Sequence, residues 1–425
     1  MKHYDVAVIG GGFSGVAAAL AAAREGCKVL IVEKGNAFGG AAVNCLVNPF
    51  MPYAAKLDGE KVNLAAGLFQ TIKSRLTERQ ATLTYTTSKN LIEYSFMEEE
   101  LKFILNDMIC EAGIDVLFHA YLCDAKKDGE TVTAVTLATR SGLMDVTADY
   151  FIDATGDAQL AYLAGVPTVL GRETDGLCQP MTLCFRLGNV DVEKFWAGRK
   201  ELNAKYKIAL EKGEFINPRE NVLSVKMPVP NVLHLNTTRV VKLDPTNPVD
   251  VSNAELIARK QVYEVYEFMK KNADGLENSF LMMTAPEIGV RESRKIVGEY
   301  VLTEEDLRAF TKFEDGIAAC NYEIDIHSPE GTGTSHYFFP VGEYYTIPYR
   351  SLIPKTVNNM LVAGRCISSD HGAQASYRIM PTVCCIGEAA GTAIGLAVKN
   401  HSGVRDISVP KLQSVLKANG AFLGV

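Results

Sequence analysis

The sequence lacks the features of several protein classes. No apolar run reaches the roughly 18 residues that a membrane-spanning helix needs, and the chain opens directly on a strand-like run rather than on a signal peptide. The formal net charge of −7 argues against nucleic acid or an anionic membrane as a partner. We therefore expect a cytoplasmic protein that binds neither a membrane nor nucleic acid.

Closely spaced metal ligands are also missing. The ten cysteines are scattered, and no C-x-x-C motif occurs among them. Zinc and iron–sulfur sites need paired ligands at short spacing, so no metal site is expected. Free thiols in a reducing compartment are the default for this pattern, and we interpret Cys45, Cys384 and Cys385 as packing residues.

The first forty residues have the pattern strand, glycine turn, helix, strand. An apolar run, residues 5–10, leads into G-x-G-x-x-G, formed by Gly10, Gly12 and Gly15, and the second apolar run ends at Glu33. In this setting the glycines permit a tight turn, a close approach of the backbone to a pyrophosphate, and close packing of the helix on the sheet. The helix N-terminus can bind the phosphates and the acidic residue can bind the ribose hydroxyls, so the pattern predicts a dinucleotide site.

A second glycine pair, Gly39 and Gly40, follows Glu33 closely. NAD-binding units do not usually place a glycine-rich loop there, whereas many flavoproteins run this loop beneath the flavin diphosphate. The cofactor is therefore predicted to be FAD. The other residues expected to contact it in this region are Phe13, Ser14, Lys34, Ala41 and Asn44.

A further motif, A-T-G-D, ends the apolar run that starts at Phe151. It places Ala154, Gly156 and Asp157 at the end of a strand, where the glycine allows a close backbone approach. Asp157 can bind a cofactor hydroxyl, or it can cap the helix that follows.

These motifs resemble those of the large flavoprotein superfamily that includes glutathione reductase and fumarate reductase, and the chain looks like an FAD-dependent oxidoreductase nearly from end to end. The resemblance implies an α/β fold, with a Rossmann-like FAD-binding domain whose parallel sheet carries a β-meander and an inserted α+β substrate domain. The expected boundaries are 1–165 and 345–425 for the FAD-binding domain and 166–344 for the substrate or cap domain. Hydrophobic spacing predicts helices over 63–80, 97–113, 191–211 and 252–274.

The segment 359–399 is expected to return to the FAD-binding domain. Gly364 and Arg365 end a buried strand, and a small-residue-rich helix begins near Pro381 and Thr382. Its N-terminus carries partial positive charge that suits the flavin. The first glycine loop contains no histidine that could bind the flavin covalently, so FAD is expected to be non-covalent.

Two candidate catalytic residues precede this helix. The fumarate reductase branch has a similar H-G-x-x-R segment that places an arginine on the substrate, and its counterparts here are His371, Gly372 and Arg378. His371 is the leading candidate for the general base, because an ordinary histidine has a pKa of about 6.5, and Arg378 is its electrostatic partner. The alternative is that His371 only hydrogen-bonds the FAD.

Two further candidates lie in the middle of the chain. Arg291 and Arg294 flank Glu292, and they can either contact an anion or polyhydroxyl substrate or form a buried Arg–Glu pair. His336 lies on a glycine-rich loop that can form a catalytic wall beside the flavin.

Three functions follow from this site. The first is oxidation of a C–OH group on a sugar or hydroxy acid by hydride transfer to flavin N5, and the second is reduction of an activated C=C bond. The third is a flavoprotein subunit of a larger electron-transfer complex. No second G-x-G-x-x-G occurs, so a separate electron donor or acceptor is expected beside the small-molecule substrate, and the sequence leaves open a homo-oligomer.

Overall fold

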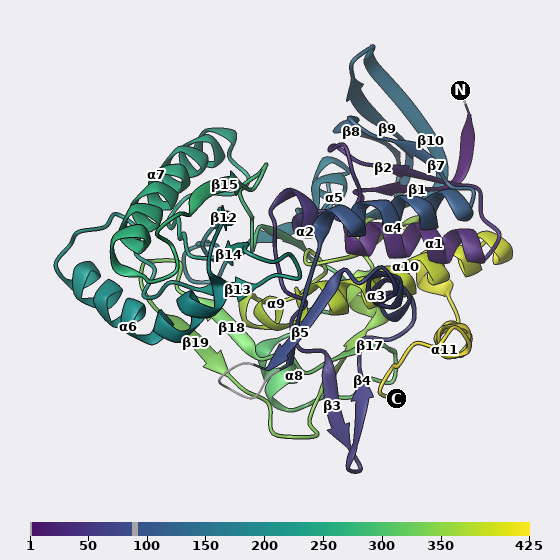
Figure 1. The fold of residues 1–425 in the computed structure, drawn as a ribbon. Coiled ribbons are helices and arrows are strands. Elements are labelled where there is room, and N and C mark those ends of the chain that lie inside the picture. Colours follow the sequence, from purple (N-terminus) through teal and green to yellow (C-terminus); the bar gives the residue numbers. More distant parts are fainter. Residues whose placement is uncertain (1, 87–91) are drawn as a thin grey trace.

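The computed structural model describes residues 2–86 and 92–425. It is organised around a parallel sheet near the N-terminus, in the order β7-β2-β1-β10, with β21 paired to β10 on the other side (Figure 1). These strands are β1 (His3–Ile9), β2 (Val29–Val32), β7 (Asp115–Leu117), β10 (Gly142–Asp153) and β21 (Met360–Val362). The run predicted before the glycine turn and the run ending at Glu33 are therefore neighbours, as a Rossmann-like unit requires.

β10 is a long strand that serves two pairings. Its first half, from Gly142 to Thr147, pairs antiparallel with β9 (Thr131–Thr139), which in turn pairs with β8 (Tyr121–Asp128). Its second half pairs parallel with β1, from Thr147 to Asp153. The predicted meander thus continues directly into the parallel sheet.

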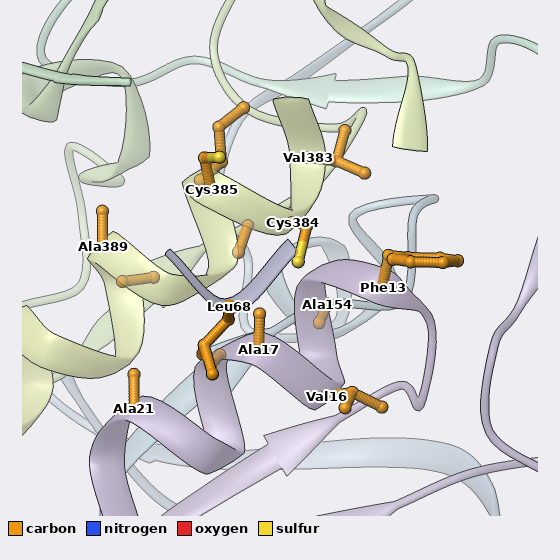
Figure 2. Close-up of a cluster of buried hydrophobic side chains, with 14 of the residues drawn as sticks. Phe13, Val16, Ala17, Ala21, Leu68, Ala154, Val383, Cys384, Cys385 and Ala389 are labelled. Carbon is orange, nitrogen blue, oxygen red and sulfur yellow. The ribbon is translucent and has the colours of Figure 1, made fainter. Parts of the chain in front are cut away.

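Two helices from opposite ends of the chain, α1 (Phe13–Arg24) and α10 (Met380–Asn400), lie side by side (Figure 1). They approach so closely because small residues face each other. A Cβ atom added at Gly387 would lie 2.1 Å from the Ser14 carbonyl oxygen, and one added at Gly391 would lie 2.1 Å from the Ala18 carbonyl oxygen. Figure 2 shows the apolar side chains of this contact, with Ala17 and Ala21 on α1, Cys384, Cys385 and Ala389 on α10, and Leu68 beside them.

The other elements of this part of the molecule are smaller, and most of them pack on the same core. They are α2 (Ala41–Asn44), β3 (Ala54–Leu57), β4 (Glu60–Asn63), α3 (Leu68–Glu78), β5 (Thr82–Thr86), β6 (Ile92–Phe96), α4 (Glu98–Glu111), α5 (Gln159–Leu163), α8 (Glu304–Arg308), β17 (Gly316–Cys320), β20 (Tyr345–Pro348), η1 (Tyr349–Leu352), α9 (His371–Tyr377), η2 (Val404–Asp406) and α11 (Val409–Ala418).

A second part of the molecule contains α6, α7 and the strands beside them (Figure 1). It has its own hydrophobic cluster. It contains an antiparallel sheet in the order β13-β14-β12-β15, with α6 and α7 beside it. The bounds are β12 (Phe185–Gly188), α6 (Val192–Glu211), β13 (Ser224–Lys226), β14 (Leu233–Leu235), α7 (Pro248–Asn272) and β15 (Phe280–Thr284). Two further antiparallel pairs complete the described strands: β11 (Thr168–Leu170) pairs with the distant β16 (Arg294–Ile296), and β18 (Ile324–His327) forms a hairpin with β19 (Thr334–Tyr337).

One predicted helix is shorter than expected. The spacing of leucines predicts a helix over 63–80, but α3 begins at Leu68, after Gly67 with a φ of 60°. Leu64 is buried in a small cluster with Ala55 and Ala319 instead. The helical spacing of apolar residues continues back to Leu64, but the positive φ at Gly67 ends the helical backbone before that residue.

The domain boundaries remain a prediction. The described structure shows that the hydrophobic cluster of α1 and α10 also contains Leu302, Ile317 and Ile324, which lie inside the range 166–344. By length and composition the α10 helix could cross a membrane, and 89% of its most apolar 18-residue stretch is buried inside the protein.

The contact between α1 and α10 makes a prediction about stability. Gly391→Ala would place a methyl group against the Ala18 carbonyl, and such overpacking costs about 1–3 kcal/mol, so the thermal unfolding midpoint should fall. The matched control is Gly198→Ala in α6, where an added Cβ meets nothing within 4 Å and the midpoint should stay or rise. Equal midpoints for the two variants would contradict the tight contact.

Candidate functional site

A cavity of about 410 Å³ lies at the carboxyl ends of the parallel strands. Ile9 at the end of β1, Glu33 after β2, Ala154 after β10 and Gly364 after β21 all line it. Ligands of open α/β sheets bind at this edge. The sequence motifs that were far apart along the chain are therefore brought to one place.

The glycines of the first motif shape the floor of this cavity. Gly10 has a φ of 107°, and a Cβ atom there would lie 2.4 Å from the Ala154 carbonyl oxygen. Gly12 and Gly40 face each other, because a Cβ atom on Gly40 would lie 2.9 Å from the Gly12 Cα atom. Gly15 has the packing role that was expected, since its added Cβ would overlap the Gly10 carbonyl oxygen.

The N-terminus of α1 opens into the cavity at Gly12, Phe13 and Ser14. Within the described chain, no side chain caps this helix at Gly12. Its first N–H groups therefore remain available as donors, and an uncapped helix N-terminus of this length is suited to phosphate oxygens.

Glu33 lies at the other rim of the glycine turn and is 5% exposed. Its Oε2 accepts a hydrogen bond from the Gly11 N–H at 2.6 Å, and its Oε1 accepts one from the Gly35 N–H at 2.7 Å. Each oxygen keeps a second lone pair, so the carboxylate is held in place and can still accept ribose hydroxyls.

Asp157 of the second motif is bound to two side chains. Its Oδ1 accepts hydrogen bonds from Arg365 Nη2 at 2.7 Å and from Ser293 Oγ at 2.6 Å. Burial acts to raise the pKa of Asp157, but Arg365 and Ser293 lower it below its ordinary value. At the start of α5 the Gln159 N–H donates to Thr155 Oγ1 rather than to Asp157. Asp157 is therefore not the cap of that helix.

Arg365 lies across Gly156, where an added Cβ would be 2.8 Å from the Arg365 Nη1 atom. Its buried Nε atom has no hydrogen-bond partner in the part of the chain that the structure describes. A buried donor of this kind calls for an acceptor. Arg365 and Asp157 both line the cavity, so the acceptor can be a cofactor oxygen.

The opposite end of the cavity is formed by the N-terminus of α10. Met380 and Val383 line it there, and no side chain among the described residues caps the helix at Ile379. The predicted contacts Pro381 and Thr382 begin the same helix but are buried behind this lining. The uncapped N–H groups carry the partial positive charge expected for the flavin end.

Arg378 is the one of the four predicted catalytic residues that lines the cavity, within the described chain. Its Nη2 donates to the Asp325 carbonyl at 3.2 Å, while its buried Nε has no partner among the residues described. Five residues separate it from Gly372, against two in the H-G-x-x-R pattern. The likeness to that segment is therefore weaker than the shared residue types indicate.

The other three predicted catalytic residues lie outside the lining. His371 starts α9, and its Nδ1 lies 2.8 Å from Glu292 Oε2. Arg291 donates to the Pro180 carbonyl and to Thr182 Oγ1. His336 is partly exposed on β19.

The buried Arg–Glu pair, one of the two alternatives for these residues, does not form between the described side chains. Glu292 is fully buried and pairs with Lys295 Nζ at 2.7 Å as well as with His371, whereas Arg294 stacks on the Tyr162 ring. Only Arg294 lies in β16; Arg291 and Glu292 precede this strand in irregular chain, so the strand-like alternation that brought the three residues together does not hold.

Several lining residues were missed. Those with a recognisable signal are Ala120, Tyr121 and Leu122, because they follow the third parallel strand β7 and so reach the same sheet edge. Ile288 and Val290 carry no such signal. They come from a loop of the second part of the molecule that folds back on the cavity.

The chain matches the protein family described as FAD dependent oxidoreductase over residues 5–416. It belongs to this family. FAD is the cofactor that the family implies, and the site fits it: two glycine loops face each other, a held carboxylate lies at one rim, an uncapped helix N-terminus lies between, and Arg365 offers an unpaired donor.

Shorter similarities agree with the family. The chain is 30% identical over 159 residues to the soluble pyridine nucleotide transhydrogenase of Mycobacterium bovis, which covers 37% of this chain and 31% of that protein. It is 49% identical over 61 residues to glutathione reductase of Yarrowia lipolytica, covering 14% of this chain and 13% of that protein. The chain thus matches less than a third of the length of these curated relatives.

A solved structure shows the same fold. The p-nitrophenol 4-monooxygenase of Pseudomonas putida superposes with a TM-score of 0.50 at 10% identity, covering 98% of this chain and 84% of that one. At this identity the likeness shows the fold alone, a mixed α/β fold, while membership of the FAD dependent oxidoreductase family rests on the family match.

The held carboxylate makes a prediction about cofactor binding. Glu33→Gln would turn an NH2 group toward the Gly11 or Gly35 N–H, which removes one acceptor and loses a charge-assisted bond. We expect FAD affinity to fall about tenfold to hundredfold, as measured by titrating apoprotein with FAD and following flavin fluorescence. The exposed Glu60→Gln on β4 is the control and should bind FAD as the wild type does, and equal affinities for the two variants would refute the role of Glu33.

Proposed function

We propose that this enzyme oxidises a C–OH group of a small polar substrate, a sugar or a hydroxy acid. The observation that carries the proposal is Arg378, whose side chain is 15% exposed and lines the cavity together with Met380 and Val383 at the N-terminus of α10. A guanidinium there can donate to the substrate oxygen and orient the carbon that bears it. Bound FAD supplies the two-electron acceptor at N5 of its ring.

The reaction needs two transfers from the substrate. Oxidation to a carbonyl compound removes a hydride from carbon, which bound FAD would accept, and a proton from oxygen, which a protein base must take. Arg378 stays charged and holds the oxygen as it becomes a carbonyl. Turnover would also need a separate electron acceptor.

His371 remains the predicted base, and its surroundings suggest a second role. It starts α9, and Arg378 is the residue that ends this helix. The bond from His371 to the buried Glu292 fixes the helix, so His371 can also act as a positioning residue for Arg378. Arg291 and His336 are kept as residues of the surrounding polar wall.

Two other functions stay open to test. Reduction of an activated C=C bond would use the same Arg378 to polarise the group conjugated with that bond. A flavoprotein subunit of an electron-transfer complex is favoured by a different observation, the edge strand β15, on which Phe280 is 54% and Met282 50% exposed. We further infer that the protein works in the cytoplasm, because Cys110 and Cys123 are exposed free thiols.

The first experiment is an anaerobic screen of the holoenzyme that follows the visible flavin absorbance. Sugars, hydroxy acids and enoates are added one by one, the enoates to enzyme that has been reduced beforehand. Bleaching by an alcohol-bearing compound is the expected result. Reoxidation by an enoate alone would assign the reductase function, and a change only in the presence of a protein partner would assign the subunit function.

The two residues can be separated by substitution. Arg378→Gln should keep FAD bound and slow anaerobic flavin reduction about a hundredfold to a thousandfold, as loss of one oriented donor does. His371→Ala should also keep FAD and slow the reduction. Unchanged kinetics in either variant would remove that residue from the mechanism.

The pH profile then distinguishes the two roles of His371. A direct base leaves its own titration in the dependence of the reduction rate on pH, and this limb would be lost in His371→Ala. A positioning residue changes the rate at every pH by the same factor.

A further inference from the structure

Four arginines lie within one charged network: Asp325 and His327 link Arg378 to Arg239, and Arg219, Arg239 and Arg378 all act to lower the pKa of Arg291. We call Arg219, Arg239, Arg291 and Arg378 the arginine cluster. Arg239 is 1% exposed and Arg219 is 6% exposed, while Arg378 is 15% exposed in its side chain and Arg291 is partly buried. Arg378 also lines the cavity, so the cluster and the cavity share one residue.

Asp325 on β18 is the carboxylate that holds these groups together. Its Oδ2 lies 3.2 Å from His327 Nε2 and 3.6 Å from Arg378 Nη2, and it accepts from Tyr322 Oη at 3.1 Å. Burial acts to raise the pKa of Asp325, but His327, Arg378 and Arg291 lower it far below its usual range. Asp325 is therefore ionised and already occupied.

His327 contributes no positive charge. Arg239 Nη2 lies 3.2 Å from His327 Nδ1 and can only donate, so Nδ1 must be the accepting nitrogen. The proton of the neutral ring is then on Nε2, which donates to Asp325. Burial and the neighbouring Arg291 lower the pKa of His327, in agreement with this neutral form.

The remaining carboxylates leave an excess of positive charge. Glu220 lies 3.2 Å from Arg239, and Glu323 lies 2.8 Å from His336. With Asp325 this gives three carboxylates against four guanidinium groups among the described residues of the cluster and its neighbours. The excess is at least one positive charge in a largely buried place.

The unpaired charge falls on two arginines. Arg219 Nε donates to Asn221 Oδ1 at 3.3 Å, and Arg291 donates to the Pro180 carbonyl and Thr182 Oγ1. Across the described chain neither guanidinium has a carboxylate at ion-pair distance, unlike Arg239. Burial, then Arg378, Arg219 and Arg239, lower the pKa of Arg291 to about 9. A buried guanidinium without an anion is costly, so the molecule without ligand lacks a partner here.

We infer that the arginine cluster binds the carboxylate of an organic acid substrate. The inference rests on the proposed function and selects within it: of the two C–OH substrate classes, the hydroxy acid fits and the neutral sugar does not. One carboxylate balances the single excess charge and matches the planar guanidinium, whereas a phosphate monoester of nearly double charge would face Asp325. In this arrangement Arg378 lies between the two ends of the substrate. The arginine cluster binds the carboxylate, and the carbon to be oxidised lies in the cavity.

The test uses the holoenzyme and a panel of short mono- and dicarboxylic acids, their methyl esters, and inorganic phosphate, all at one ionic strength. Binding is followed by the perturbation of the flavin spectrum and by the unfolding midpoint, which a bound ligand raises. The acids should bind saturably, and the esters and phosphate should not. Esters that bind as well as acids, binding of phosphate alone, or no binding of any acid would each overturn the inference.

Substitutions locate the site. Arg219→Gln and Arg291→Gln should weaken acid binding about tenfold to hundredfold, the factor for one charge-assisted hydrogen bond, and Arg291→Lys should recover part of the loss. The control is Arg259→Gln on α7, whose side chain is 51% exposed and paired with Glu255, and which should bind acids as the wild type does. Equal affinities in the Gln variants and the control would place the acids elsewhere.

A stability measurement separates binding from a structural role. Removing an unpaired buried charge should raise the unfolding midpoint of ligand-free Arg219→Gln while its affinity for acids falls. A lower midpoint with unchanged affinity would show that Arg219 is structural and would overturn the inference for this residue. If Arg219→Gln does not fold, the comparison of acids with esters on the wild type still decides whether the protein binds a carboxylate.

The outcome also separates this inference from the proposed function. Hydroxy acids that bind at the cluster without reducing the flavin would refute the proposed dehydrogenase while leaving the anion site. Flavin reduction by neutral sugars as fast as by hydroxy acids would keep the dehydrogenase and refute the anion site.

Discussion

The contact of α1 with α10 is the constraint on which the rest of the structure depends. Because Gly387 and Gly391 bring the second helix against the Ser14 and Ala18 carbonyls, the first and last thirds of the chain share one core. The N-termini of both helices then open into the same cavity, one at the glycine turn and the other beside Arg378. One packing contact thus places two helix N-termini at the same cavity.

The sequence predicted the cofactor half of the site because backbone geometry dictates its residues. Only glycine fits at Gly10, where an added Cβ would meet Ala154, and at Gly40, where it would meet Gly12, so these positions are visible without a structure. The substrate half could not be predicted in the same way. His371 turned out to be bound to Glu292 outside the cavity lining, and Asp325 meets Arg378 across 53 positions of the chain. Such pairings depend on how loops fold together, and no local pattern encodes them.

Charge is distributed unequally between the two halves. In the cofactor half, Glu33 is held by backbone donors and Asp157 by Arg365 and Ser293, so its acids are satisfied before any ligand binds. In the substrate half, Arg219 and Arg291 remain without an anion in the described structure. The acids beside the glycine loops are thus paired within the protein, whereas the arginine cluster keeps guanidinium groups without a carboxylate partner among the described residues.

The double pairing of β10 has a consequence for how this site tolerates change. The strand carries the register of the meander on one side and delivers the Ala154–Asp157 turn to the cavity on the other. Length changes in the β9–β10 turn, near Ser141, would be absorbed at the exposed tip. A one-residue deletion inside β10 would instead shift every later residue of the strand by one place and turn each of their side chains to the opposite face. The number of residues in β10 therefore sets the position of the Ala154–Asp157 turn, whereas the number of residues in the β9–β10 turn does not.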